Sequence, residues 1–276
     1  MSQEPAPSPG RRARRRRRQD SGRRGLAWLL PHLLTTGNLA AGFYAIVASG
    51  AGELDRAAFA VVLAGIFDGL DGRVARRVGS TSRFGGEYDS IADTVSFGVA
   101  PAVIAFGAGA LGELGWTGWV LAFLYMACAA LRLARFNVSA GRYIGRFEGL
   151  PSPAAAGMVV ASSMFAGFMR ESGWPLELPA LLPGLGVAFL GLLMVSAVPY
   201  HSFKGLRVRG SYRALVLMVI GFAVLLLKPQ VTLFVVGISY VSSGPIEWLW
   251  RWRTGRVLEP IVPPEELSDD EGETLP

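Results

Sequence analysis

Residues Phe67–Asp93 read FDGLDGRVARRVGSTSRFGGEYDSIAD, and this stretch places four aspartates between two apolar runs that are typical of membrane helices. Asp68 and Asp71 are three residues apart, so on a helix they share one face. Asp89 and Asp93 are four residues apart and share a face of the next helix in the same way. Acidic groups are costly beside a bilayer, so we expect the four to converge around a compensating positive charge.

The composition indicates a protein with several membrane helices. The chain has 276 residues, of which 51% are hydrophobic and only 17% charged, and its mean hydropathy is +0.37. This is too apolar for a soluble domain of the same length, so a polytopic membrane protein is expected. The single cysteine, Cys128, excludes an intramolecular disulfide, and the two histidines, His32 and His201, are too far apart in sequence to form a metal-ligand motif.

Both ends of the chain have a composition typical of disordered tails. Residues 1–25 contain the run RRARRRRR from Arg11 to Arg18 and no apolar periodicity. Residues 251–276 are rich in proline and then in acidic side chains. The arginine run is interpreted as a topology signal that also attracts anionic lipid headgroups, in preference to a nucleic-acid-binding tail or an export signal.

Between the tails, residues 26–250 are expected to form an all-α polytopic bundle of about eight transmembrane helices. The second apolar run is long enough to span a membrane only if it continues through Asp71 and Ala75, which places the first two aspartates at the end of a membrane helix. The third run begins near Gly85, so the second pair of aspartates is expected at the same side of the membrane. The runs cover approximately residues 26–49, 57–75, 85–108, 116–136, 153–168, 178–198, 214–227 and 231–250.

The basic residues predict the orientation of this bundle. Eight spans put both termini on one side, and all but three of the 27 Lys and Arg residues then lie on that side, the exceptions being Arg56, Arg170 and Lys228. By the positive-inside rule this side is cytoplasmic. Both termini and the aspartate cluster are therefore expected to face the cytoplasm.

The four aspartates are candidate ligands for one or two divalent metal ions. Together they carry about four negative charges, and burying these without a partner would cost many kcal/mol. Arg76 is able to neutralise one acid but not all four, so a purely structural network is the less favoured interpretation. Mg²⁺ and Mn²⁺ prefer carboxylate oxygens, and such a site suits a pyrophosphate ligand. We therefore predict a Mg²⁺ or Mn²⁺ site formed by Asp68, Asp71, Asp89 and Asp93.

The spacing of these residues resembles the signature of the CDP-alcohol phosphotransferase family at every position. It reads Asp71-Gly72-x-x-Ala75-Arg76, then Gly85 after eight residues, Asp89 after three and Asp93 after three more, with a further acid, Asp68, just upstream. Five flanking blocks look like the phosphatidylserine synthase branch of that family: PHLLTTGNLAAGF from Pro31, ADTVSFGVAPA from Ala92, LRLARFN from Leu131, GLPSPAAAG from Gly149 and VSAVPYHSFK from Val195. His32 departs from the branch, in which an asparagine is expected.

The resemblance implies roles for individual residues. Asp68, Asp71 and Asp89 would hold metal ions, and Asp93 would contribute to a second ion and act as the general base. Glycines let a nucleotide approach the backbone closely, and an arginine is suited to pair with phosphates. The residues that would bind the CDP group are Gly72, Ala75, Arg76, Ser82 and Gly85.

The implied reaction is attack by the hydroxyl of L-serine on the phosphorus next to diacylglycerol in CDP-diacylglycerol, giving phosphatidylserine and CMP. The serine carboxylate calls for a cation, for which Arg135 is the first candidate, followed by Arg132, Asn137 and Lys204. The alternatives are the same chemistry with glycerol 3-phosphate or inositol phosphate, and a non-enzymatic metal transporter. The resemblance also implies an integral protein of a bacterial cell membrane, surrounded by membrane lipids, compatible with a homodimer and without a nucleic-acid partner.

Overall fold

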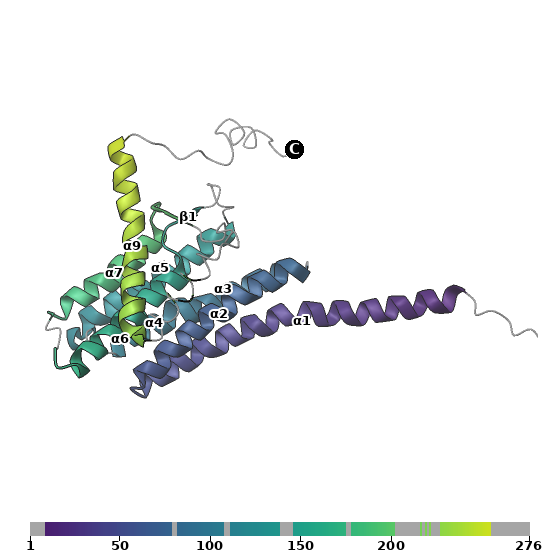
Figure 1. Ribbon diagram of the computed structural model, residues 1–276, viewed down its shortest axis with the longest axis horizontal. Helices are drawn as coiled ribbons and strands as arrows, with labels where there is room; N and C mark the ends of the chain where they lie inside the picture. Colours follow the sequence, from purple (N-terminus) through teal and green to yellow (C-terminus); the bar gives the residue numbers. More distant parts are fainter. Residues whose placement is uncertain are drawn as a thin grey trace, which may run out of the picture.

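The computed structural model describes residues 9–78, 82–107, 111–138, 146–174, 178–201 and 227–254, together with the single positions Val216, Val219 and Gly221. The described chain is mostly helical, as the apolar periodicity predicts (Figure 1). Its longer helices are α1 (Pro9–Gly50), α2 (Leu54–Val78), α3 (Arg83–Asp93), α4 (Ala100–Gly107), α5 (Trp116–Val138), α6 (Ser152–Glu171), α7 (Leu181–Val195) and α9 (Pro229–Thr254).

Among the described residues, four helices are long and apolar enough to cross a membrane, which indicates an integral membrane protein. Helices α2 and α9, which cover the expected spans 57–75 and 231–250, are not among these four. The apolar helix α7 is shorter, and most of the expected span 214–227 lies outside the described residues. The count of eight spans and the cytoplasmic position of both termini therefore stay predictions. The four candidate spans are Leu29–Gly50, Arg83–Gly107, Trp116–Val138 and Ser152–Glu171.

The structure differs from the sequence prediction in two local features. First, α1 begins at Pro9, so the backbone of the arginine run is helical where we expected disorder; arginine is a good helix former, and adding it to an existing helix needs no new nucleus. Second, the fold is not purely α-helical, because β1 (Arg146–Glu148) and β2 (Pro199–His201) form a two-stranded antiparallel sheet. Residues 255–276 of the predicted acidic tail lie outside the described residues.

Helices α1 and α2 form an antiparallel pair, and they run side by side in Figure 1. The turn between them passes through Gly52, whose φ of 78° lies in the left-handed region that glycine adopts without strain. Small residues allow the two helices to approach closely. The buried alanines between them include Ala45, Ala57 and Ala64.

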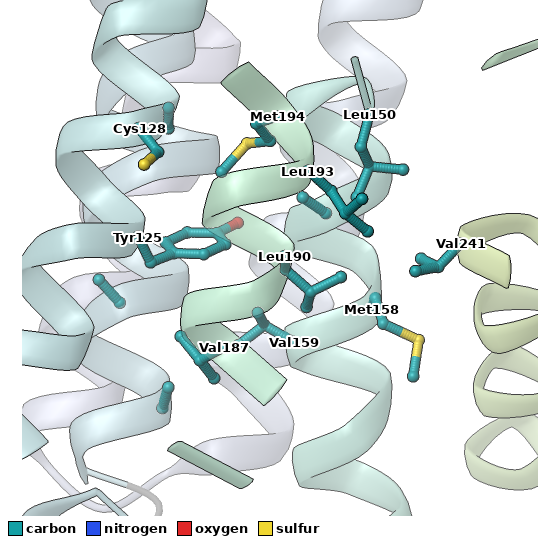
Figure 2. Close-up of a cluster of buried hydrophobic side chains, with 14 of the residues drawn as sticks. Tyr125, Cys128, Leu150, Met158, Val159, Val187, Leu190, Leu193, Met194 and Val241 are labelled. Atoms are coloured by element: carbon teal, nitrogen blue, oxygen red, sulfur yellow. The ribbon is translucent and has the colours of Figure 1, made fainter. Parts of the chain in front are cut away.

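A second apolar core joins α5, α6, α7 and α9 (Figure 2). Tyr125 and Cys128 of α5 lie in it on the side of Met194 of α7, whereas Leu193 of α7 points toward Leu150. Cys128 is a free, buried thiol, which agrees with a packing role for this side chain. This core holds α5 and α7 together.

The short strand β2 is fastened to α9 by Tyr200. Its ring is fully buried, and its hydroxyl donates a 2.9 Å hydrogen bond to the carbonyl oxygen of Val241. Burial raises the pKa of Tyr200 to about 12, so the hydroxyl remains a donor at neutral pH. Gly244 leaves the room for this ring, since a Cβ at that position would lie 2.4 Å from Tyr200 Cζ.

Candidate active site

Three of the four predicted metal ligands converge. Asp68 and Asp71 lie on one face of α2, and Asp89 lies on α3, which packs against α1. One carboxylate oxygen of each residue lies within 4.8 Å of the corresponding oxygens of the other two. The spacing of three residues on α2 therefore produces the shared face that the sequence predicted, and Asp89 on α3 is the third acid of the group.

Asp71 is held in place by a residue of α1. Thr35 Oγ1 lies 2.9 Å from Asp71 Oδ2 and donates to it, and both side chains are buried. The same hydroxyl lies 3.1 Å from the carbonyl oxygen of Pro31, one turn earlier in α1. This contact orients the carboxylate without placing a cation beside it, so Asp71 stays available to a metal ion.

The three carboxylates fit a hard divalent cation. Asp89 Oδ1 is buried and has no hydrogen-bond partner among the described residues. A buried carboxylate oxygen without a partner is costly unless a cation or another donor approaches it. Oxygen ligands from Asp68, Asp71 and Asp89 match the preference of Mg²⁺ and Mn²⁺, so the donor set supports the predicted metal centre.

Asp93 lies one helical turn beyond Asp89 and is not part of the trio. Its side chain is buried, and Asn38 Nδ2 of α1 donates a 2.9 Å hydrogen bond to Asp93 Oδ1. The π-helical segment η1 (Thr94–Val99) begins directly after this residue. Such widened turns are often found at functional sites. Asp93 thus lies outside the group of three acids whose oxygens are within 4.8 Å of one another, on the same helix as Asp89.

A pocket of about 210 Å³ opens beside the acidic trio. All five residues predicted to bind the CDP group line it, together with two of the acids. The lining residues are Pro31, His32, Thr35, Asp71, Gly72, Ala75, Arg76, Ser82, Gly85, Gly86 and Asp89.

The first turn of α3 shapes one wall of this pocket. Ser82 is the N-cap of α3, and its Oγ accepts a 3.0 Å hydrogen bond from the backbone N–H of Gly85. A Cβ at Gly85 would lie 3.0 Å from His32 Cε1 and 3.1 Å from Ser82 Oγ. A side chain at this position would press on His32 of α1 and on the cap of α3, so glycine suits this close approach. Ser82 has both the capping role and a position in the pocket wall.

Sequence reasoning missed the contribution of α1. Pro31, His32 and Thr35 line the pocket, and Asn38 contacts Asp93. The available signal was the occurrence of polar side chains one turn apart on an otherwise apolar first span, in the block PHLLTTGN. Which helix these side chains face is a tertiary property, so the pattern alone did not assign them to the site.

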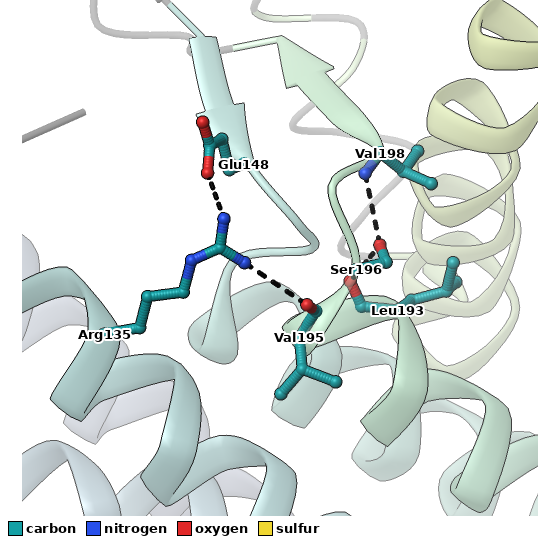
Figure 3. A network of polar contacts seen from close by, with 6 residues as sticks. All are labelled: Arg135, Glu148, Leu193, Val195, Ser196 and Val198. Atoms are coloured by element: carbon teal, nitrogen blue, oxygen red, sulfur yellow. Dashed lines mark hydrogen bonds and ion pairs between the residues drawn. The ribbon is translucent and has the colours of Figure 1, made fainter. Parts of the chain in front are cut away.

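The predicted serine ligands are not equivalent in the structure. Arg135 forms an ion pair with Glu148 of β1 and donates a 3.4 Å hydrogen bond to the carbonyl oxygen of Val195 at the end of α7 (Figure 3). In the same view, Ser196 closes the α7 end by accepting from the Val198 N–H at 3.3 Å. Arg135, the first candidate for the serine carboxylate, is thus engaged in joining α5 to β1 and α7.

Arg132, the second candidate, has a different environment. Its guanidinium donates a 3.1 Å hydrogen bond to Ser152 Oγ, and Asp93 is among the charged groups that act on it electrostatically. Its Nε is buried and has no hydrogen-bond partner among the described residues. Asn137 Nδ2 donates a 2.9 Å hydrogen bond to Ser90 Oγ, and Lys204 lies outside the described residues.

The family model for CDP-alcohol phosphatidyltransferase matches residues 28–198. The chain is 34% identical over 227 residues to a CDP-diacylglycerol–serine O-phosphatidyltransferase of Helicobacter pylori, covering 81% of this chain and 92% of that protein. It is 34% identical over 238 residues to a Mycobacterium tuberculosis protein of the same name, covering 81% and 80%. An archaetidylserine synthase of Methanothermobacter thermautotrophicus is 35% identical over 184 residues, covering 64% of this chain and 71% of that protein.

Proposed function

The chain belongs to the CDP-alcohol phosphatidyltransferase family, and we propose that it transfers the phosphatidyl group of CDP-diacylglycerol to the hydroxyl of L-serine, giving phosphatidylserine and CMP. Membership of this transferase family identifies the chain as an enzyme, so the transporter hypothesis is wrong. The observation that carries the proposal is the convergence of Asp68, Asp71 and Asp89 beside a pocket lined by every residue predicted to bind CDP. The names of the relatives support serine as the acceptor.

In this proposal Asp68, Asp71 and Asp89 hold a Mg²⁺ or Mn²⁺ ion, and Asp93 contributes to a second. When bound, the metal offsets the negative charge of the pyrophosphate and of the departing CMP. The pocket residues then bind and orient the nucleotide: Arg76 pairs with phosphate oxygens, and Gly72 and Gly85 allow the nucleotide to approach the backbone.

Asp93 is the proposed general base. It removes the proton from the serine hydroxyl while the serine oxygen forms a bond to the phosphorus next to diacylglycerol. The bond from this phosphorus to the oxygen of CMP breaks, and CMP leaves with the electron pair. The burial of Asp93 and its separation from the trio support this role, because the base has to reach the acceptor rather than the nucleotide.

Arg132 is the proposed ligand of the serine carboxylate, in preference to Arg135. The proposal rests on its buried Nε, a donor that has no hydrogen-bond partner among the described residues, and on the electrostatic influence of Asp93 on this guanidinium. Arg135 already has a carboxylate partner in Glu148. A substrate carboxylate beside Arg132 would bring the serine hydroxyl near Asp93, as an in-line displacement requires.

The enzyme is proposed to lie in a bacterial cell membrane, with residues 26–250 forming an eight-span catalytic domain and the site facing the cytoplasm. The tails, residues 1–25 and 251–276, are proposed to lie on the same side. A homodimer follows from the family resemblance alone.

An acceptor screen tests the function. Purified protein is incubated with CDP-diacylglycerol labelled in the phosphatidyl group and Mn²⁺ or Mg²⁺, with L-serine, glycerol 3-phosphate or inositol phosphate. We expect labelled phosphatidylserine and an equal amount of CMP with L-serine only. Transfer to one of the other acceptors by folded protein, with none to serine, would overturn the acceptor assignment and keep the chemistry.

A further inference from the structure

Two polar side chains of α1 each donate a hydrogen bond to an acid on a different helix. Thr35 contacts Asp71 of α2, and Asn38, three residues later on the same face, contacts Asp93 of α3; each bond measures 2.9 Å. One turn of α1 thus contacts Asp71, an acid of the trio, and Asp93, which lies outside the trio. The spacing between the metal-binding trio and the proposed base is therefore set in part by a helix that carries none of them.

The backbone of α1 at Asn38 is held by η1. Asn38 is completely buried, and its backbone carbonyl oxygen accepts a 3.0 Å hydrogen bond from Ser96 Oγ of η1, while its side-chain Oδ1 has no hydrogen-bond partner among the described residues. The backbones of α1 and η1 approach closely at Gly42, where a Cβ would lie 2.2 Å from Ser96 Oγ and 2.8 Å from Ser96 Cα. Any side chain at Gly42 would push α1 away from η1, so the sequence keeps this approach open.

The backbone that follows Asp93 is also held by a neighbouring helix. The π-helical segment η1 follows Asp93 directly, and Tyr125 Oη of α5 donates a 3.1 Å hydrogen bond to the carbonyl oxygen of Phe97 within it. Phe97 and Ser96 are both buried. The backbone that carries Asp93 is therefore held from α1 on one side and from α5 on the other.

We propose that Asn38 is a positioning residue, which orients the carboxylate of Asp93 for proton transfer from the acceptor hydroxyl. The inference rests on the proposed function, in which Asp93 is the base. The amide engages Oδ1, which fixes the rotation of the carboxylate and assigns Oδ2 as the oxygen that receives the proton. Asn38 itself touches neither substrate nor metal.

A purely structural role for Asn38, as an anchor between α1 and α3, makes a different prediction. Loss of an anchor would loosen the pocket wall formed by α1 and α3, so nucleotide binding and turnover would fall together. Loss of a positioning contact lowers kcat and leaves binding of CDP-diacylglycerol unchanged, because the pocket residues do not include Asn38.

The test compares Asn38→Leu, which removes the donor at similar volume, with Ser49→Ala as matched control. Ser49 is another buried polar residue of α1, and its Oγ has no hydrogen-bond partner among the described residues. We expect Asn38→Leu to lower kcat by about 10- to 100-fold, as removal of a supporting hydrogen bond typically does. The KM for CDP-diacylglycerol and the rise in unfolding temperature on adding this lipid should remain as in the wild type. Ser49→Ala should retain full kcat.

If Asn38→Leu does not fold, Asn38→Ala removes the same donor without adding bulk, and the same split between kcat and KM is expected. A folded Asn38 variant with wild-type kcat would overturn the proposal. So would a fall in kcat accompanied by an equal loss of lipid-induced stabilisation. The comparison uses the acceptor that supports turnover in the wild type, so a wrong acceptor in the proposed function leaves this test intact.

Discussion

Thr35 Oγ1 donates a 2.9 Å hydrogen bond to Asp71 Oδ2, which ties the first helix to an acid of the trio that is proposed to bind metal. Replacing Thr35 with valine keeps the shape of the side chain and removes this donor. We expect the concentration of Mn²⁺ that gives half-maximal CMP release to rise by about 10- to 100-fold, because the carboxylate loses its orienting partner. Thr35→Ser, which retains the hydroxyl, should respond to Mn²⁺ much as the wild type does. Equal Mn²⁺ dependence in Thr35→Val and wild type would contradict this role.

Because Asp93 lies outside the trio, we expect that removing the proposed base leaves metal binding by the other three acids in place. Asp93→Asn should lower turnover by about 10²- to 10⁴-fold, the usual contribution of a general base. Asp68, Asp71 and Asp89 remain in this variant, so binding of one Mn²⁺ ion, measured by electron paramagnetic resonance, should persist. Unaltered CMP release would remove the base assignment. Asp89→Asn provides the comparison, because it should weaken Mn²⁺ binding as well as turnover.

Gly85 is predicted to be intolerant of any side chain. A Cβ would lie 3.0 Å from His32 Cε1, so Gly85→Ala should displace His32 or the cap of α3 and narrow the nucleotide pocket. We expect the KM for CDP-diacylglycerol to rise by about tenfold, a cost of 1.4 kcal/mol in binding. Gly186→Ala in α7 is the control, because nothing lies within 4 Å of a Cβ there. Identical KM values for the two variants would refute the steric argument.

The two arginines of α5 are predicted to differ in effect. Arg132→Ala should raise the KM for serine by about 10- to 100-fold, the range expected for a hydrogen bond to a charged group. Its KM for CDP-diacylglycerol should stay the same, because Arg132 does not line the nucleotide pocket.

Arg135→Ala serves as the internal comparison for this pair. It should act on stability rather than on serine, because Arg135 joins α5 to Glu148 and to the Val195 carbonyl. The Arg135 side chain is 44% exposed, so the loss should be small, about 1 kcal/mol or less. Glu148→Gln should give the same modest fall in unfolding temperature. A larger serine KM in Arg135→Ala than in Arg132→Ala would reverse the assignment.

Local patterns in the sequence predicted the family and the acidic centre. The family prediction is confirmed by the match over residues 28–198. Asp68 and Asp71 share a face because they are three apart on one helix, and Gly85, Asp89 and Asp93 follow on the next. Hydrophobic runs also placed the helices, although they did not indicate η1 after Asp93, since a π-helical turn has no distinct periodicity over six residues.

What the sequence by itself determined is therefore the set of residues whose relations are local: acids at helical spacing, glycines at fixed distances from them, and apolar segments long enough to span a bilayer. The tertiary structure decided which distant side chains serve this set. It turned Thr35 and Asn38 toward acids 36 and 55 residues away, and it paired Arg135 with Glu148 while Arg132 donates to Ser152. The physical reason is that helical periodicity defines a face, whereas only the packing of helices determines what that face contacts.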